Sequence, residues 1–227
     1  MATKSRLTGW KWTAFILGSL WAAVGCTPGT LTGLLMPFSD DKVPPVCKLA
    51  KKQEVTVCIV TNFATLETRL DTVPAANELS ELFAQQLRKR AEENKEKIKV
   101  LPPSKTRSYA SAADFTGRTL QDIGKECKAD YVISLEITKL DLYEPRSQQM
   151  LYHGNTDINI QVVDVTRPAG EGLIYNDAFR REFPRSGPRD ASDMSSDRFR
   201  LMFLNAVAGD LTRMFTAYAS DQRNMID

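Results

Sequence analysis

The run Val-Thr-Val-Cys-Ile-Val-Thr-Asn-Phe at residues 55–63 limits most strongly the folds that this chain can adopt. Its β-branched and apolar residues follow one another almost without interruption, which is typical of a strand buried on both faces. A strand of this kind needs other elements to cover both of its sides. We therefore expect a layered domain in which helices pack on a sheet, and we place that domain at residues 51–219.

Helical spacing of apolar residues predicts helices in three places along this domain. The first helix begins near Pro74, and its buried stripe consists of Leu79, Leu82, Phe83 and Leu87. The second is short and follows Thr119, which together with Asp122 comes close to a capping box. The third docks on the core through a broad stripe that consists of Phe199, Met202, Phe203, Ala206, Val207, Leu211, Met214, Phe215 and Tyr218.

Apolar runs and alternation predict the remaining strands. Residues 98–101 and 131–137 form short apolar runs. Apolar and polar residues alternate over 157–165, which indicates a strand with one buried and one wet face. A turn rich in glycine separates it from a strand at 173–183, so these two strands should form an antiparallel hairpin. The expected fold is α/β (α+β): a single mixed β-sheet of about five strands packed by about three helices.

Residues 1–25 have the three-part layout of an export signal. A basic start is followed by an uncharged, mostly apolar stretch, and small residues close the segment. The closing Ala-Val-Gly-Cys at residues 23–26 resembles the bacterial lipobox, in which the cysteine receives a diacylglycerol before cleavage. This resemblance implies that Cys26 carries lipid and is the first residue of the mature protein.

Residues 26–50 follow as a lipid-bearing cysteine and a flexible tether, because their prolines and glycines discourage both helix and sheet. Residues 220–227 are expected to be a polar tail. Two alternatives to the lipoprotein signal stay open. One is a membrane-spanning anchor, which needs roughly 20 apolar residues and which Pro28 with Gly29 would interrupt. The other is a plain secretory signal with a coincidental cysteine.

The predicted signal also accounts for the positive net charge of the whole chain. Residues 1–25 hold three of the 30 Lys and Arg residues and none of the 28 Asp and Glu residues. The rest of the chain therefore has a formal net charge of −1 instead of +2. No polybasic block is present in the sequence, so a nucleic-acid partner is not expected.

Three cysteines remain once Cys26 is assigned to lipid, an odd number for a compartment that permits disulfides. Cys58 lies inside the apolar strand at 55–63 and is most simply a buried small hydrophobic residue. Cys47 and Cys127 are left as a possible disulfide pair, with two free thiols as the alternative. No CxxC motif occurs, so the sequence supports neither a redox motif nor a zinc knuckle.

Few residues of this chain suit catalysis or cofactor binding. His153 is the only histidine, which argues against a hydrolase triad and multi-histidine metal sites, and we expect it at the surface or in a loop. Neither a P-loop nor a GxGxxG motif occurs. Four acids lie near predicted strand ends or in the hairpin, where aspartates typically accept backbone N–H groups in turns; they are Asp130, Asp157, Asp164 and Asp177. We predict no catalytic, cofactor-binding or metal-binding residues and no enzymatic activity.

Two short passages carry a resemblance to a known family. They are Ile-Gly-Lys-Glu-Cys-Lys-Ala-Asp-Tyr-Val-Ile-Ser at residues 123–134, and Val163-Asp164-Val165 before a glycine-containing turn. Together with the element order over about residues 53–218, they resemble the family of the curli secretion lipoprotein CsgG and the LpoB-like lipoprotein activators of penicillin-binding proteins. The periplasmic amino-terminal domain of TolB is a more distant relative. The resemblance implies an envelope lipoprotein that acts through protein contacts. Because only one ordinary hairpin is visible, a membrane-pore form is not expected.

The first functional hypothesis is a lipid-anchored, non-catalytic module that binds or assembles envelope proteins on the periplasmic side of a bacterial membrane. The lipid on Cys26 anchors the protein to the membrane. By the enterobacterial rule for lipoproteins, Thr27 rather than Asp after this cysteine favours the outer membrane. The partner and the oligomeric state stay open, and the loops 102–118 and 184–196 are candidate contact regions. The alternative is an accessory lipoprotein of an envelope transport system that binds lipid or another apolar ligand. An apolar cavity between sheet and final helix would favour this alternative, and a filled core the first hypothesis.

Overall fold

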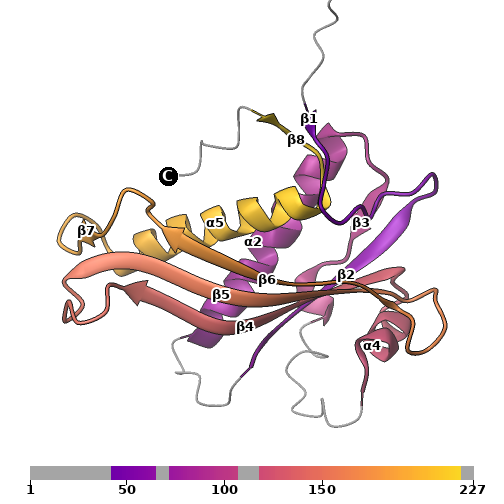
Figure 1. Cartoon of the computed structure of the whole chain (residues 1–227), viewed down its shortest axis with the longest axis horizontal. Helices are drawn as coiled ribbons and strands as arrows, with labels where there is room; N and C mark the ends of the chain where they lie inside the picture. The colour runs from indigo at the N-terminus through magenta and orange to yellow at the C-terminus, as the bar shows by residue number, and fades with distance from the viewer. Residues whose placement is uncertain (1–41, 65–71, 107–117, 221–227) are drawn as a thin grey trace, which may run out of the picture. The chain divides into compact units, whose positions relative to one another are not determined.

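The computed structural model describes residues 42–64, 72–106 and 118–220 of the chain (Figure 1). The predicted signal at 1–25, the lipid site Cys26 and the first part of the tether lie outside the described residues. The elements follow in the order β1 (Lys42–Val43), β2 (Val55–Phe63), α2 (Thr72–Glu93), β3 (Ile98–Val100), α4 (Leu120–Glu126), β4 (Tyr131–Tyr143), β5 (Leu151–Asp164), β6 (Leu173–Phe183), β7 (Arg189–Asp190), α5 (Ser196–Phe215) and β8 (Tyr218–Ala219). No helix within these ranges has the length and apolar character needed to cross a membrane.

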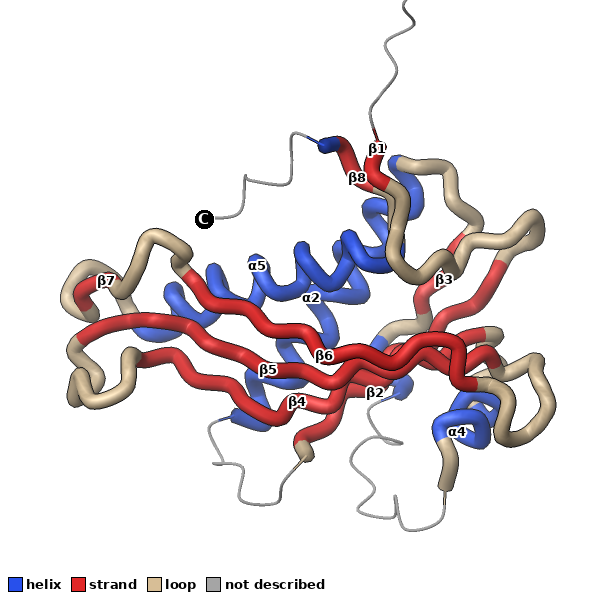
Figure 2. Tube along the Cα trace, viewed as in Figure 1, coloured by secondary structure: helices blue, strands red, loops and turns tan. Residues whose placement is uncertain are grey.

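The main sheet has the strand order β3-β2-β4-β5-β6, with β7 paired to the start of β5 (Figure 2). β2 runs parallel to β3 and β4, because a helix-containing connection leads from each strand to its parallel neighbour. β4, β5 and β6 are antiparallel and are joined by short turns. This arrangement confirms the predicted mixed sheet packed by helices.

The two long helices α2 and α5 lie together on one face of the sheet, whereas α4 lies on the other face at one end (Figure 1). The core between the sheet and the long helices is built from aliphatic strand residues and the rings of Phe83, Phe199, Phe203 and Phe215, which are all fully buried. The ring of Phe199 stacks on that of Tyr152 with centroids 4.6 Å apart. These rings fill the space between α5 and the strands.

The antiparallel strands are longer than the sequence pattern predicts. β4 continues six residues past the expected end at Ile137, and β5 begins six residues before Asp157. Beyond the apolar run at 131–137, the β4–β5 register shifts after Ile137 and again after Asp141, so no single regular pattern continues along β4. The expectation of a single hairpin is therefore wrong: β4, β5 and β6 form two successive hairpins, and we call these three strands the ribbon.

Part of the ribbon extends beyond the parallel strands. The last pair between β2 and β4 joins Phe63 to Ile137, so the rest of β4 pairs only with β5. The end of β6 pairs with this extension of β5, from Asn155 opposite Glu182 to Gly154 opposite Phe183. The ribbon therefore exposes a length of sheet that no parallel strand flanks.

The predicted boundary between tether and domain is wrong for residues 42–50. β1 pairs with β8 near the end of the described chain, and the Cys47 N–H donates to the Met214 carbonyl over 2.9 Å. Cys47 and Leu49 are buried against the core. The prolines keep this segment out of long regular structure, as expected, but its apolar side chains still attach it to α5.

The possible pair Cys47 and Cys127 is not brought together in the structure. Cys47 belongs to the core on the side of the long helices, whereas Cys127 packs against the smaller cluster beneath α4. Cys58 is completely buried, as predicted, and its Sγ lies 3.7 Å from the Sγ of Cys127. All three of these cysteines are free in the structure.

Candidate protein-binding surface

The ribbon has one face that packs on the long helices and one face that no long helix covers. From Leu151 to Val162 of β5 the burial alternates, with buried residues toward α5 and half-buried residues on the opposite side. The strand registers place polar residues of the neighbouring strands beside the half-buried set. We call this surface the open face, and it consists of Glu136, Lys139, Asp141, Asn155, Asp157, Asn159, Gln161, Asn176, Arg180 and Glu182.

Side chains of the open face contact one another across the strands. The Asn159 amide donates to Glu136 Oε2 over 3.1 Å. Arg180 Nε lies 3.5 Å from Asp157 Oδ1 and 3.9 Å from Glu182 Oε1. Exposed ion pairs of this kind contribute only about 0–1 kcal/mol to stability. The open face is therefore a surface of hydrogen-bonding groups that the fold does not need for its own cohesion.

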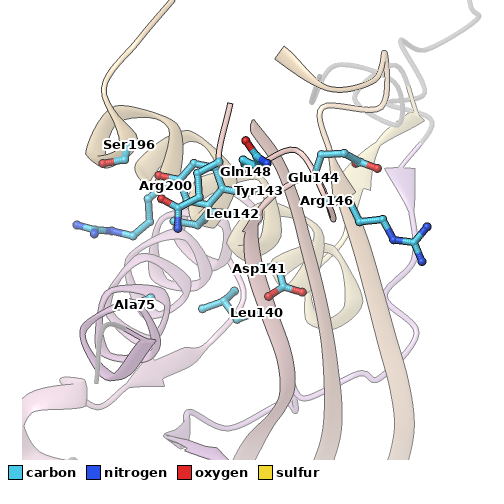
Figure 3. Close-up of a pocket in the computed structure, with 11 residues that line it drawn as sticks. Ala75, Leu140, Asp141, Leu142, Tyr143, Glu144, Arg146, Gln148, Ser196 and Arg200 are labelled. Atoms are coloured by element: carbon cyan, nitrogen blue, oxygen red, sulfur yellow. The ribbon is translucent and has the colours of Figure 1, made fainter. Parts of the chain in front are cut away.

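A pocket lies at the end of the ribbon, where the β4–β5 turn meets the first turns of α2 and α5. Its volume is about 590 Å³. Figure 3 shows Arg146 and Arg200 on opposite sides of this pocket, with Tyr143 and Gln148 between them. We call it the hairpin pocket, and it is lined by Ala75, Leu140, Asp141, Leu142, Tyr143, Glu144, Arg146, Gln148, Gln149, Ser196 and Arg200.

Side-chain contacts fix two walls of the hairpin pocket. Arg200 Nε on α5 lies 3.1 Å from Glu78 Oε2 on α2, which connects the two helices at the pocket. On the turn side, His153 Nδ1 lies 2.5 Å from Glu144 Oε2. His153 was expected at the surface or in a loop; it is half-buried and lies within β5, because β5 begins earlier than predicted. Its contact with Glu144 ties the turn to the strand.

The strand-end acids act mostly as expected. Asp130 Oδ2 accepts the Thr56 N–H over 2.7 Å, Asp164 Oδ1 accepts the Thr166 N–H over 3.0 Å, and Asp177 Oδ1 accepts the Ala178 N–H over 2.8 Å. Hydrogen bonds from Thr166 and the charge of Lys51 lower the pKa of Asp164, although its burial acts in the opposite direction. Asp157 differs, because it belongs to the open face.

One arginine of β6, Arg181, is buried. Arg181 points toward α5, and its guanidinium lies 3.2 Å from Asp210 Oδ2. Arg213 lies 2.9 Å from the other oxygen of the same carboxylate. Alternation along β6 places Arg181 on the helix-covered face and Arg180 on the open face, so neighbouring residues have opposite environments.

The candidate contact loops are only partly described. Residues 107–117 of the first loop lie outside the described residues. Within the second loop, β7 adds a short pair to the start of β5, with Leu151 opposite Asp190. In the described ranges, no group of three or more His, Cys, Asp or Glu side chains is arranged to hold a metal ion.

No protein-family model and no curated protein matches this chain. Among solved structures, the PelC dodecamer from Paraburkholderia phytofirmans is 10% identical with a TM-score of 0.39, covering 74% of this chain and 92% of that one. Lipoprotein GNA1162 from Neisseria meningitidis is 12% identical with a TM-score of 0.36, covering 69% of this chain and 97% of that one. The LpoB C-terminal domain from Salmonella enterica is 17% identical with a TM-score of 0.32, covering 58% of this chain and 87% of that one.

These similarities are distant, and nothing about the function of this chain follows from them. The LpoB domain belongs to the group that residues 123–134 resemble, so the resemblance stated from sequence recurs as a low-identity structural similarity. Membership of that family is not shown by it. The functional residues of this chain therefore have to be found from its own surfaces.

Proposed function

We propose that this chain is a lipid-anchored, non-catalytic module on the periplasmic side of a bacterial membrane, and that it binds or assembles another envelope protein. The lipobox-like end of the signal, with Cys26 as the lipidated residue, supports the anchor. Thr27 after it favours the outer membrane. The open face of the ribbon supports the binding role and is the observation on which the proposal rests.

The composition of the open face supports a role in recognition. Asparagine and aspartate are poor strand formers, because their side chains compete for backbone hydrogen bonds. Five of the ten open-face residues are nevertheless of these two types: Asp141, Asn155, Asp157, Asn159 and Asn176. Their amides and carboxylates provide donors and acceptors on a rigid, hydrogen-bonded sheet. Such a surface can supply part of the roughly ten direct hydrogen bonds that a protein interface typically contains.

The packing of the core argues against the transport alternative. That alternative requires an apolar cavity between the sheet and the final helix. Beyond the hairpin pocket at the start of α5, the stacked pair Tyr152 and Phe199 fills the space between the sheet and this helix, and Phe183 lies beside both Phe199 and Phe203, with ring centroids 5.8 and 6.2 Å apart. A lipid tail could enter only by displacing these rings. The filled core therefore supports the protein-binding hypothesis.

The acids do not support a hydrolase either. Glycosidic chemistry uses two carboxyl groups that face one another across a cleft. Asp130 and Asp164 instead accept backbone N–H groups at strand ends, and Asp177 accepts the N–H of Ala178 within β6, which holds all three in structural roles. Asp157 lies on the open face beside Arg180.

Site-specific photocrosslinking in the native envelope tests the binding surface. A photoreactive phenylalanine analogue replaces Asn159 at the centre of the open face, and in a matched variant it replaces Lys89, an exposed residue of α2. We expect a discrete crosslinked species from position 159 and none from position 89. Equal labelling at both positions, or none at position 159, would contradict a partner on the open face.

The anchor is tested separately by the intact mass of the protein extracted from membranes. All three tryptophans of the chain lie in the predicted signal. We expect a chain that begins at a lipid-modified Cys26 and shows no tryptophan emission, and we expect Cys26→Ser to abolish lipid attachment. An uncut chain with tryptophan emission would overturn the lipoprotein assignment.

A further inference from the structure

Two cysteines that are distant in sequence meet beneath α4. Cys58 lies in the middle of β2 and is fully buried on the sheet face that α4 covers. Cys127 is the C-cap residue of α4 and is half-buried. Their sulfur atoms are 3.7 Å apart, so the two thiols are in direct contact.

We propose that Cys58 and Cys127 are joined by a disulfide when the chain is in an oxidising compartment, so that α4 is covalently fastened to β2. A disulfide has an S–S length of about 2.05 Å, and the sulfurs would therefore have to approach by less than 2 Å. Cys127 stands at the end of a helix and outside the sheet ladder, where a small side-chain adjustment is easiest. The proposal depends on the periplasmic location proposed above only for its oxidising environment.

The pairing accounts for all four cysteines of the chain. Cys26 is assigned to lipid, and Cys47 is buried alone in the cluster on the opposite face of the sheet. A bridge from Cys47 to either of the other two would have to pass through the sheet. The odd number of thiols left after lipidation thus resolves into one pair and one inert, buried thiol.

The bridge would act where a short helix is attached to the sheet by a small cluster. The cluster beneath α4 is small, and the helix itself has only seven residues. Its contact with the sheet is close at Gly124, where an added Cβ would lie 2.7 Å from a methyl group of Val132. A bridge between positions 69 residues apart would restrain the unfolded chain and hold α4 on the sheet.

The chemistry requires a disulfide oxidant, for which oxidised glutathione is a suitable probe. The half-exposed Cys127 thiolate attacks one glutathione sulfur, which forms a mixed disulfide and expels the first glutathione thiolate. The Cys58 thiolate then attacks Cys127 Sγ, which forms the internal bridge and expels the second. The two cysteine protons end on the two released glutathiones, so two thiols are oxidised and one glutathione disulfide is reduced.

Burial raises the pKa of both thiols, most strongly that of Cys58. Little thiolate is therefore present near neutral pH, and the bridge should form slowly without a catalyst. Because only the thiolate attacks, the rate of bridge formation should increase as the pH rises, by up to about tenfold per pH unit well below the pKa.

The test uses the full lipidated protein, extracted from membranes under conditions that trap free thiols. Denaturation, alkylation and peptide mass spectrometry then count the thiols at each position. We expect a Cys58–Cys127 linked peptide and one free thiol at Cys47, and three free thiols after reduction. The oxidised protein should unfold at a higher temperature than the reduced one, by on the order of 5–10 °C.

Single variants separate the pairing from a general sensitivity to oxidation. With oxidised glutathione, Cys47→Ser should form the bridge as the wild type does. Cys127→Ser, a change at a half-exposed helix end, should leave Cys58 reduced. Cys58→Ser should retain one glutathione on Cys127, because the resolving thiol is missing.

Some outcomes would contradict the pairing itself, and another would contradict only the periplasmic location. Three free thiols in the wild type even after incubation with oxidised glutathione would overturn the pairing, as would a bridge that involves Cys47. A bridge that forms with glutathione but is absent from the freshly extracted protein would support the pairing and count against the periplasmic location. Failure of the inference and failure of the proposed function are thus distinguishable.

Discussion

The two faces of the ribbon differ in nearly every property although they are built from the same strands. On the covered face, Ile158 and Ile160 of β5 are buried against the long helices. On the open face, the alternate residues Asp157 and Asn159 are half-buried, and their side chains contact polar side chains of neighbouring strands. The covered face therefore contributes most of the ribbon's share of the folding free energy. Residues of the open face can vary with little effect on stability, so they are available for binding. Substitutions one residue apart can test this division.

The largest effect is expected from Phe203→Ala. This ring is fully buried on α5, packs on Phe183, and fills the space above Gly154. Loss of a buried phenylalanine costs about 3–5 kcal/mol, which urea unfolding followed by circular dichroism measures. Leu201→Ala on the same helix is the control, because Leu201 is 44% exposed and should change the unfolding free energy by less than about 1 kcal/mol. Similar losses in both variants would contradict the assignment of the core.

Arginines 180 and 181 provide the next comparison, since they are adjacent in sequence and lie on opposite faces. The Arg181 side chain is 4% exposed and contacts Asp210, whereas that of Arg180 is 65% exposed. Arg181→Met removes this contact and leaves Asp210 its ion pair with Arg213, and we expect a loss on the order of 2–3 kcal/mol. Arg180→Met should cost less than about 0.5 kcal/mol. Equal costs in urea unfolding would mean that β6 does not divide the two faces as described.

Gly154→Ala should destabilise the domain by a smaller amount. A Cβ at this position would lie 2.7 Å from the Phe203 ring, so the ring or the strand has to move. We expect a cost of about 1–2 kcal/mol in urea unfolding. In a Phe203→Leu background, where the contacting ring is absent, the same change should cost clearly less. A cost that does not depend on residue 203 would mean that the close contact is not its cause.

How much of this division could be predicted from sequence depended on how regular each pattern is. β2 and the inner half of β5 were predicted because uninterrupted apolar residues and strict alternation are local signals. The outer half of β4 was missed because the register shifts after Ile137 and Asp141 leave no single regular pattern there. Because the outer half of β4 was not predicted, the sequence indicated a solvent-exposed face on one strand but not the three-stranded ribbon.

Features that depend on where distant segments meet were not predictable from sequence. The prolines of residues 42–50 correctly indicated that this segment forms no long helix or strand. The burial of Leu49 depends on α5, which lies far along the chain. The pairing of cysteines depends on which face of the sheet each segment reaches. Cys47 and Cys127 were paired by elimination, whereas the register of β2 places Cys58 under α4.

The smallest effect on stability, and the most informative for function, is expected from Asn159→Ala. Its amide makes one described side-chain contact, with Glu136, on a half-exposed face, so the unfolding free energy should change by less than about 0.5 kcal/mol. If the open face binds a protein, the same change at its centre should weaken that binding about tenfold or more. Crosslinking yield from a photoreactive group at Asn176, compared with and without the change, measures this loss. A variant that loses stability but keeps its crosslink would make Asn159 a folding residue and move the binding surface elsewhere.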